Sequence, residues 1–391
     1  MSVQSPITSP ESPQGPEEEE NAKTRNLDIT ALNGEHRDLL TRAIGRVVST
    51  EIAEVTYAQL LDGLPLAEVA FESNYDPLHN KHPIRQVHQQ LCPGIMEEAR
   101  KFRDEFKLET LQFDAKVRCH SNSCFCYHYC HLFSSDKLTV KLLFEFQAAA
   151  SGSRSFKNRL LELVVVAIHQ LAVLLYRVGE TRHKDDGVHD WKPPESDELY
   201  WEFHPSGPLP TMFQHAWYID YDQYPEGVAD MAAYWAESRI MGGVVLFDRR
   251  DPAADLRADP SAVYIHPDKY DAPYRIVQLL PEQRQALLDF LIGQDQPAKS
   301  LLPLTVDENN TKRVDPEEPI RETGIYRDLW ERKDFPPDAT DSRLRDVWDT
   351  FNFPTTADKE AAGDRAWERK MRLKYGDQWE SSMDEALGGG Q

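Results

Sequence analysis

The stretch that decides the fold is residues 213–249, FQHAWYIDYDQYPEGVADMAAYWAESRIMGGVVLFDR. It opens with a loop of aromatic and acidic residues. Residues 226–240 then have helical spacing, and Gly242-Gly243 ends the helix. Residues 244–247 form an unbroken apolar run, which is typical of a buried strand. A helix followed directly by a buried strand predicts a mixed α/β domain. The loop of aromatic and acidic residues at 215–224, called the ring-rich loop, predicts a pocket wall.

The rest of the chain shows the same kinds of hydrophobic pattern. Helical spacing predicts helices over 36–61, 94–107, 156–177 and 281–292. Alternation of apolar and polar residues, or a short apolar run, predicts strands over 111–117, 140–146, 262–265 and 274–280. The helix over 156–177 is apolar on most sides, so we expect it to be buried.

These elements predict one α/β (mixed α+β) domain with a mixed sheet and a long buried helix. Residues 1–34 are rich in Ser, Pro and Glu and predict a disordered acidic segment. Residues 35–295 form the predicted core domain. Residues 296–391 are polar with scattered aromatics, which predicts an extended C-terminal arm.

Charge and composition narrow the class of protein. The net charge is −22 with no large basic block, which argues against a DNA-binding surface. The longest apolar run, 160–175, is interrupted by polar residues and is shorter than the roughly 20 residues of a membrane span. We find no secretory signal and no disulfide framework among the five cysteines. We therefore expect a soluble cytoplasmic protein with no membrane partner.

Three residues of the helix over 226–240 are candidates for catalysis. Asp230, Tyr234 and Glu237 follow one another at i, i+4 and i+7, so they share one helix face. Two carboxylates beside a tyrosine can divide acid and base roles, or hold a cationic group of a substrate. The alternative is structural: acidic residues favour a helix N-terminus, and Glu237 pairs with a surface base.

The helix over 156–177 supplies two more catalytic candidates. Glu162 and His169 lie near one stripe of this otherwise apolar helix. The functional interpretation makes His169 a proton shuttle that Glu162 orients. In the structural interpretation, this polar stripe faces solvent and has no catalytic role.

Substrate-binding candidates come from two loops. The ring-rich loop offers aromatic walls and acidic groups, and the loop over 182–190 offers an acidic pair that can also receive a divalent ion. The candidates are Trp217, Tyr218, Asp220, Asp222, Tyr224, Asp185 and Asp186. The alternative for the acidic pair is simple solvation.

A cluster of cysteine and histidine raises the possibility of zinc. Residues 119–131 contain four cysteines and three histidines, which are the ligands that zinc prefers. The spacing does not match paired Cys-x-x-Cys units, and alternate residues of a strand lie roughly 6–7 Å apart. A reduced hairpin loop is the alternative. We assign no metal ligand to the candidate site and expect no cofactor.

Two stretches resemble a family of fungal proteins associated with secondary metabolism. One is residues 215–249, with Asp-Gln-Tyr-Pro-x-Gly-Val-Ala-Asp, Tyr-Trp-Ala-Glu and Gly-Gly-Val-Val-Leu-Phe-Asp. The other is residues 320–332, IRETGIYRDLWER. The resemblance spans most of residues 35–375.

A more specific resemblance is to the arginine-containing cyclodipeptide synthases, which have an Asp-Asp-x-x-Glu motif. Here Asp185-Asp186 is followed by Gly187, Val188 and His189, so the glutamate is missing. The resemblance implies a transferase that joins amino acids taken from aminoacyl-tRNA, with an amino acid or other small molecule as substrate. Basic residues for tRNA are then Arg154, Lys157 and Arg159.

Two other functions stay open. One is a non-catalytic interaction or accessory protein that uses its C-terminal arm, whose tryptophans are Trp330, Trp348, Trp367 and Trp379. The other is a zinc-supported module.

Overall fold

The computed structural model describes residues 29–72, 81–107, 111, 136–179, 182–183, 186–269, 272–293, 301–333, 351 and 353–375. The segment 1–28, the Cys-His cluster at 119–131 and Asp185 lie outside the described residues, as do all of the strand predicted at 111–117 except Leu111.

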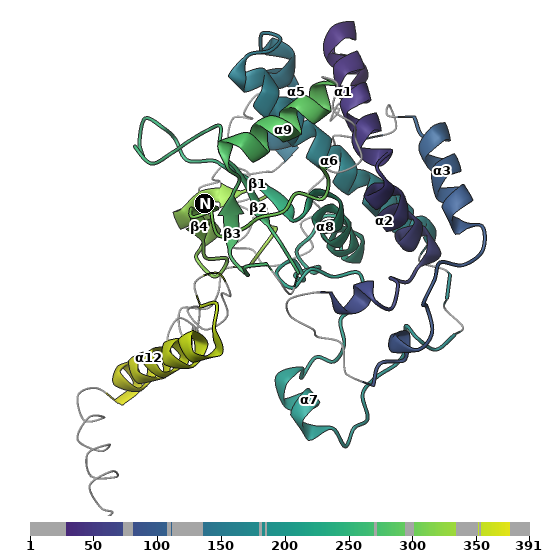
Figure 1. Ribbon diagram of the computed structural model, residues 1–391. Coiled ribbons are helices and arrows are strands. Elements are labelled where there is room, and N and C mark those ends of the chain that lie inside the picture. Colours follow the sequence, from purple (N-terminus) through teal and green to yellow (C-terminus); the bar gives the residue numbers. More distant parts are fainter. Residues whose placement is uncertain are drawn as a thin grey trace, which may run out of the picture.

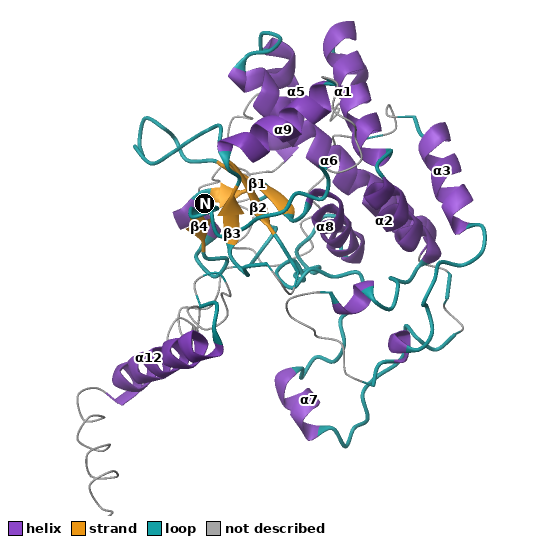
Figure 2. Cartoon of the chain, in the orientation of Figure 1, coloured by secondary structure: helices purple, strands orange, loops and turns teal. Residues whose placement is uncertain are grey.

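The fold is mixed α/β, which confirms the predicted class (Figures 1 and 2). The helices are α1 (Gly34–Val48), α2 (Glu51–Asp62), α3 (Ile95–Glu105), α5 (Asp136–Ala148), α6 (Arg154–Gly179), α7 (Glu198–Phe203), α8 (Val228–Met241), α9 (Pro281–Ile292), α10 (Ile320–Thr323) and α12 (Thr356–Tyr375). Short 3₁₀ turns cover Ile29–Ala31, Val69–Phe71 and Pro83–Arg85. The strands are β1 (Val244–Asp248), β2 (Val263–His266), β3 (Ile276–Gln278), β4 (Arg313–Val314) and β5 (Ile325–Tyr326).

One sheet joins the strands in the order β4-β3-β2-β1-β5, and all the pairings are antiparallel. β1 is buried along its whole length, as its unbroken apolar sequence indicates. The strands predicted at 244–247, 262–265 and 274–280 are therefore present. β4 and β5 come from residues 301–333, within the segment predicted as an arm, and extend the sheet at both edges.

Helices surround α6, which is the central helix of the core (Figure 1). α6 packs against α8, α2, α5 and α1, and side chains such as Leu160, Val164 and Ile168 are fully buried. Within the described residues, α6 is the one helix long and apolar enough to cross a membrane, but 67% of its apolar window is buried inside the protein. That burial is expected of the core helix of a soluble protein.

The prediction of a strand at 140–146 is wrong, because these residues belong to the helix α5. In a strand, Leu142, Phe144 and Phe146 would face the same side. In the structure Leu142, Leu143 and Phe146 are buried, whereas Phe144 is 59% exposed. The buried apolar residues therefore follow the helical period, and they are the ones that α5 packs against α6.

The single helix predicted over 36–61 is two helices, α1 and α2. Thr50 separates them: its hydroxyl donates to the Val47 carbonyl at 2.7 Å and accepts from the Ala53 N–H at 3.4 Å. Threonine is a favourable N-cap because its side chain satisfies a free N–H at the start of a helix. The chain therefore turns here without losing the apolar stripe.

Two glycines bring the ends of α2 and α6 together. A Cβ on Gly179, the last residue of α6, would lie 2.0 Å from the Leu60 carbonyl oxygen of α2. Gly63 caps α2 with φ of 91°, a left-handed conformation that favours glycine, and a Cβ there would lie 2.7 Å from the Gly179 carbonyl oxygen. The two helix ends therefore meet with no side chain between their backbones.

Candidate functional site

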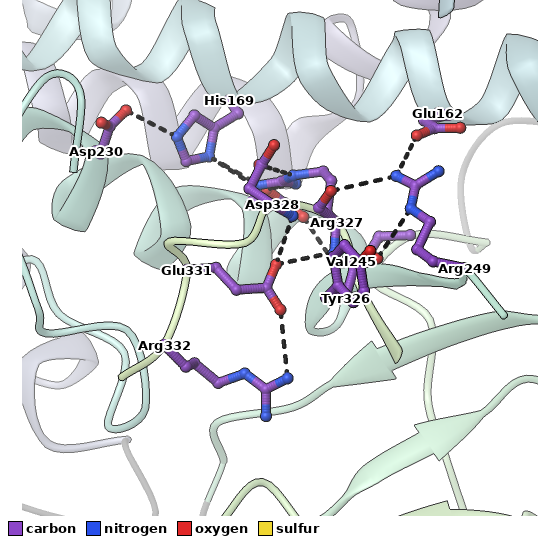
Figure 3. A network of polar contacts seen from close by, with 11 residues as sticks. Glu162, His169, Asp230, Val245, Arg249, Tyr326, Arg327, Asp328, Glu331 and Arg332 are labelled. Carbon is purple, nitrogen blue, oxygen red and sulfur yellow. Dashed lines mark hydrogen bonds and ion pairs between the residues drawn. The ribbon is translucent and has the colours of Figure 1, made fainter. Parts of the chain in front are cut away.

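Four of the five predicted catalytic residues come together in the structure. His169 of α6 has its Nε2 3.1 Å from Asp230 Oδ1 and its Nδ1 3.3 Å from Glu237 Oε2, both on α8. The Tyr234 ring meets the His169 ring edge-on, with centroids 4.6 Å apart. The helix face predicted from the i, i+4, i+7 spacing thus faces His169, and Figure 3 shows the contact of His169 with Asp230.

Arg327, which the sequence reading missed, completes this group. It follows β5, and its Nη1 donates to Glu237 Oε2 at 2.6 Å. The second oxygen of Glu237 accepts the Val245 N–H of β1 at 2.7 Å. Glu331 in turn accepts the N–H groups of Arg327 and Asp328. Its local sequence signal is weak: the run Arg-Asp-x-x-Glu-Arg lies in a segment that is rich in charged residues on both sides.

This His169 network, defined as His169, Asp230, Glu237 and Arg327, is buried and balanced in charge. Burial opposes protonation of His169, but hydrogen bonds with Asp230 and Glu237 outweigh it and raise its pKa. Burial likewise opposes ionisation of Glu237, yet Arg327 and His169 hold the pKa of that carboxyl below its ordinary value. When His169 is protonated, two cations and two carboxylates neutralise one another in the interior, an arrangement that satisfies each buried charge.

The raised pKa of His169 predicts a pH-dependent stability. Because the folded pKa exceeds the unfolded value near 6.5, the contribution is complete below that value and is lost as pH rises through the folded pKa. We therefore expect His169→Gln to lower the free energy of unfolding more at about pH 5.5 than at about pH 9.

Urea unfolding of both proteins at each pH measures this difference. Burial lowers the pKa of His215 and His266, but both residues are present in each protein, so their titration cancels in the comparison. A loss that is equal at the two pH values would show that His169 is not protonated in the network.

Glu162 lies apart from His169. Its carboxylate pairs with Arg159 Nη1 at 2.6 Å and with Arg249, which also donates to the Arg327 carbonyl at 3.3 Å (Figure 3). Burial would raise the pKa of Glu162, but Arg249 and Arg159 hold it below its ordinary value. Both nitrogens of His169 face Asp230 and Glu237, so Glu162 does not orient the imidazole.

The ring-rich loop packs inward and makes part of the core. Tyr218 is fully buried and stacks on Tyr234 with centroids 4.6 Å apart. The Tyr224 hydroxyl donates to the Glu331 carbonyl at 2.9 Å, and Trp217 is half-buried. These contacts fasten the 324–333 segment to the core.

The acidic candidates of this loop lie at its surface. Lys333 Nζ contacts Asp222 at 2.7 Å and Asp220 at 3.5 Å. These ion pairs are partly exposed, so each contributes little to stability. They join the loop to the end of the same 324–333 segment.

A small cavity lies on the opposite face of α8. It has a volume of about 20 Å³ and is lined by Met212, Gln214, Trp235, Ser238 and Arg239, among others. Gln214 Oε1 and Arg239 Nε are buried without a hydrogen-bond partner among the described residues. The space suits one water molecule. Asp230, Tyr234 and Glu237 do not line it.

A second cluster has the composition of a metal centre. Asp62, His88, Cys92 and His183 offer one ligand atom each, and these atoms all lie within 4.8 Å of one another. His88 Nε2 is 3.0 Å from Asp62 Oδ2, and His183 Nε2 is 3.4 Å from Asp62 Oδ1. Cys92 Sγ is 3.5 Å from His183 Nε2. We call these four residues the metal cluster.

The local backbone presents each ligand. Asp62 is the last residue of α2, and the Gly63 cap turns the chain away from it. Asp62 Oδ2 accepts the Cys92 N–H at 2.8 Å, which holds the segment before α3 beside α2. His183 follows the close crossing of α6 with α2 at Gly179.

The second nitrogen of each histidine has its own partner. His88 Nδ1 lies 2.8 Å from the Pro65 carbonyl, and His183 Nδ1 lies 2.6 Å from Asp186 Oδ2. Carbonyl and carboxylate partners of this kind orient metal-binding imidazoles and leave the other nitrogen to the metal. Asp186, predicted to bind substrate, thus orients a candidate ligand.

None of these four residues is predicted as a metal ligand from the sequence. The one local sequence pattern at this site is the spacing His88-x-x-x-Cys92. Cys92 is far along the chain from the other cysteines, which lie in residues 119–131. Asp62 and His183 are 121 residues apart, so only the fold brings them together.

Comparison with protein families, curated proteins and solved structures finds no match for this chain.

Proposed function

We propose that the protein binds a divalent transition metal, zinc foremost, through the metal cluster of Asp62, His88, Cys92 and His183. The observation that carries the proposal is the approach of four zinc-type donors from three separate segments to within 4.8 Å. Two imidazoles, a thiolate and a carboxylate are ligands that zinc accepts together. Zinc-bond lengths imply roughly 3.3–3.8 Å between tetrahedral ligands. The separations of 3.0, 3.4 and 3.5 Å are close to that range.

The proposed role of the metal is structural. Four protein ligands fill a tetrahedral coordination sphere, as in structural zinc sites, whereas catalytic sites keep one position for water. The metal would join the end of α2, the segment before α3 and the segment after α6. The zinc-supported module predicted from the sequence used residues 119–131, which lie outside the described residues, so the site proposed here is a different one.

We expect the reduced protein to bind one equivalent of zinc at this cluster. His88→Gln and Cys92→Ser each remove a ligand. Since loss of a residue that only orients a ligand costs about 10–100-fold in affinity, loss of a ligand should cost more than about 100-fold. Competition with a chromophoric chelator measures the affinity, and elemental analysis measures the stoichiometry.

Two control variants locate the zinc. His204→Gln removes a histidine that stacks on Tyr200, outside the cluster, and should leave zinc binding unchanged. Cys124→Ser with Cys126→Ser tests the residues 119–131, which lie outside the described residues. If this double variant abolishes binding while His88→Gln and Cys92→Ser retain it, the proposal is wrong.

A cytoplasmic location fits this proposal, because a reducing compartment keeps Cys92 reduced and able to bind a metal. Burial raises the pKa of the Cys92 thiol, so metal binding would displace its proton. The cyclodipeptide synthase remains a prediction. Of its suggested tRNA-binding residues, Arg154 pairs with Asp259, and Arg159 pairs with Glu145 and Glu162.

A further inference from the structure

Three ligands of the metal cluster are held on one side by contacts that do not involve the fourth. The Ala67 N–H donates to the His88 carbonyl at 2.8 Å, and the Leu66 N–H donates to Gln59 Oε1 at 2.8 Å. With the contacts of Asp62 to Cys92 and of His88 to Pro65, these bonds attach the segment before α3 to α2. His183 alone reaches the cluster from the segment after α6.

The chain that follows His183 is sparsely anchored. Among residues 186–210, Val188 and Pro193 are the buried ones whose burial is described. Val188 packs with Leu64, Ile84 and Met212 in a small apolar cluster separate from the main core. Segments with few buried apolar contacts open at low free-energy cost. The segment also has contacts outside this small cluster, since the Trp191 ring meets the His82 ring with centroids 4.9 Å apart and Leu209 packs at the edge of the cluster around Tyr218. Its described buried apolar side chains are nevertheless few compared with those of α6 or α8.

The backbone conformation of His183 is a second reason why the segment 186–210 could leave its position. Its φ is 58°, the one positive φ of a non-glycine residue in the described part of the chain. This left-handed conformation is unfavourable for a residue with a Cβ and persists where surrounding interactions impose it. Arg182 beside it pairs with Glu98 at 2.7 Å, but both side chains are about 40% exposed, and such pairs contribute little.

We infer that metal binding controls the position of the segment 186–210, which acts as a strap closed by the metal. The inference rests on the proposed function. With the metal bound, His183 is fixed and Val188 covers Leu64 and Ile84. Without the metal, the strained backbone at His183 relaxes and the strap leaves this small apolar cluster. Metal occupancy would therefore decide whether this surface is covered.

Hydrogen–deuterium exchange of the full-length protein tests the inference, with zinc and after chelation under reducing conditions. We expect amides in 186–210 to exchange at least about ten-fold faster without metal, while α6 and α8 are unchanged. His183→Gln should exchange rapidly in both conditions. Arg182→Gln, which loses the exposed pair with Glu98 and retains all four ligands, should behave as the wild type.

The outcomes separate this inference from the proposed function. One bound equivalent of zinc with identical exchange in 186–210 would overturn the strap and leave the metal site standing. Uniformly faster exchange in all helices after chelation would also overturn it, since the metal would then stabilise the whole fold. Absence of zinc binding would overturn the proposed function and the strap with it. If His183→Gln does not fold, Asp186→Asn takes its place in the exchange experiment. It retains all four ligands and loses only the carboxylate that orients His183.

Discussion

Replacing Arg327 with methionine is expected to lower the free energy of unfolding by about 3–5 kcal/mol. The Arg327 side chain is 3% exposed and its partner Glu237 is 0% exposed, so the substitution leaves the buried carboxylates of Glu237 and Asp230 with His169 as their shared partner. A charge left without its partner in the interior costs more than the intact pair contributes. The segment 324–333 would also lose its ion pair with α8.

Urea unfolding monitored by circular dichroism measures this loss. Arg42→Met, at an exposed position of α1, is the matched control and should change stability by less than about 0.5 kcal/mol. Adding Glu237→Gln to Arg327→Met should restore part of the stability, because glutamine keeps an acceptor for the Val245 N–H and removes the charge. Equal effects of Arg327→Met and Arg42→Met would show that Arg327 does not neutralise Glu237.

The part of the network that lies on helices could be predicted from the sequence. Asp230, Tyr234 and Glu237 share a face because the helical period is a local property, and α6 was expected to be buried from its composition. Their approach to His169 follows from the packing of the two helices, which each present a polar group within an apolar surface.

Arg327 could not be placed in the same way. It lies in a short strand–turn segment with no long period, and its position depends on pairing of β5 with β1, more than 70 residues earlier. The same segment is predicted as an extended arm because it is polar with scattered aromatic residues. Burial of paired charges is visible only once both partners are located.

The metal cluster was missed for a related reason. Its ligands are single residues at the ends of elements, and the loop 182–190 read as solvated because it is polar. Sequence spacing drew attention to residues 119–131, where cysteines and histidines are adjacent. A site assembled from helix ends needs the crossing of α2 and α6, which depends on Gly63 and Gly179.

Gly179→Ala is therefore expected to disturb both the fold and the metal cluster. The added methyl would lie 2.0 Å from the Leu60 carbonyl oxygen and 2.8 Å from the Leu61 carbonyl oxygen. These are backbone atoms of a packed helix, so relief requires α2 and α6 to separate. Overpacking in a core costs 1–3 kcal/mol where side chains adjust, and we expect about 3 kcal/mol or more here.

Separation of the two helices also predicts weaker zinc binding by Gly179→Ala. Asp62 ends α2 and His183 follows α6, so a shift of the crossing moves two ligands apart, and tetrahedral coordination tolerates little displacement. Gly45→Ala is the matched control, because its Cβ would meet nothing within 4 Å in the interior of α1. It should stabilise the protein by about 0.5–1 kcal/mol and leave zinc affinity unchanged. If Gly179→Ala unfolds like the wild type and keeps its zinc affinity, the close crossing is not what positions the metal cluster.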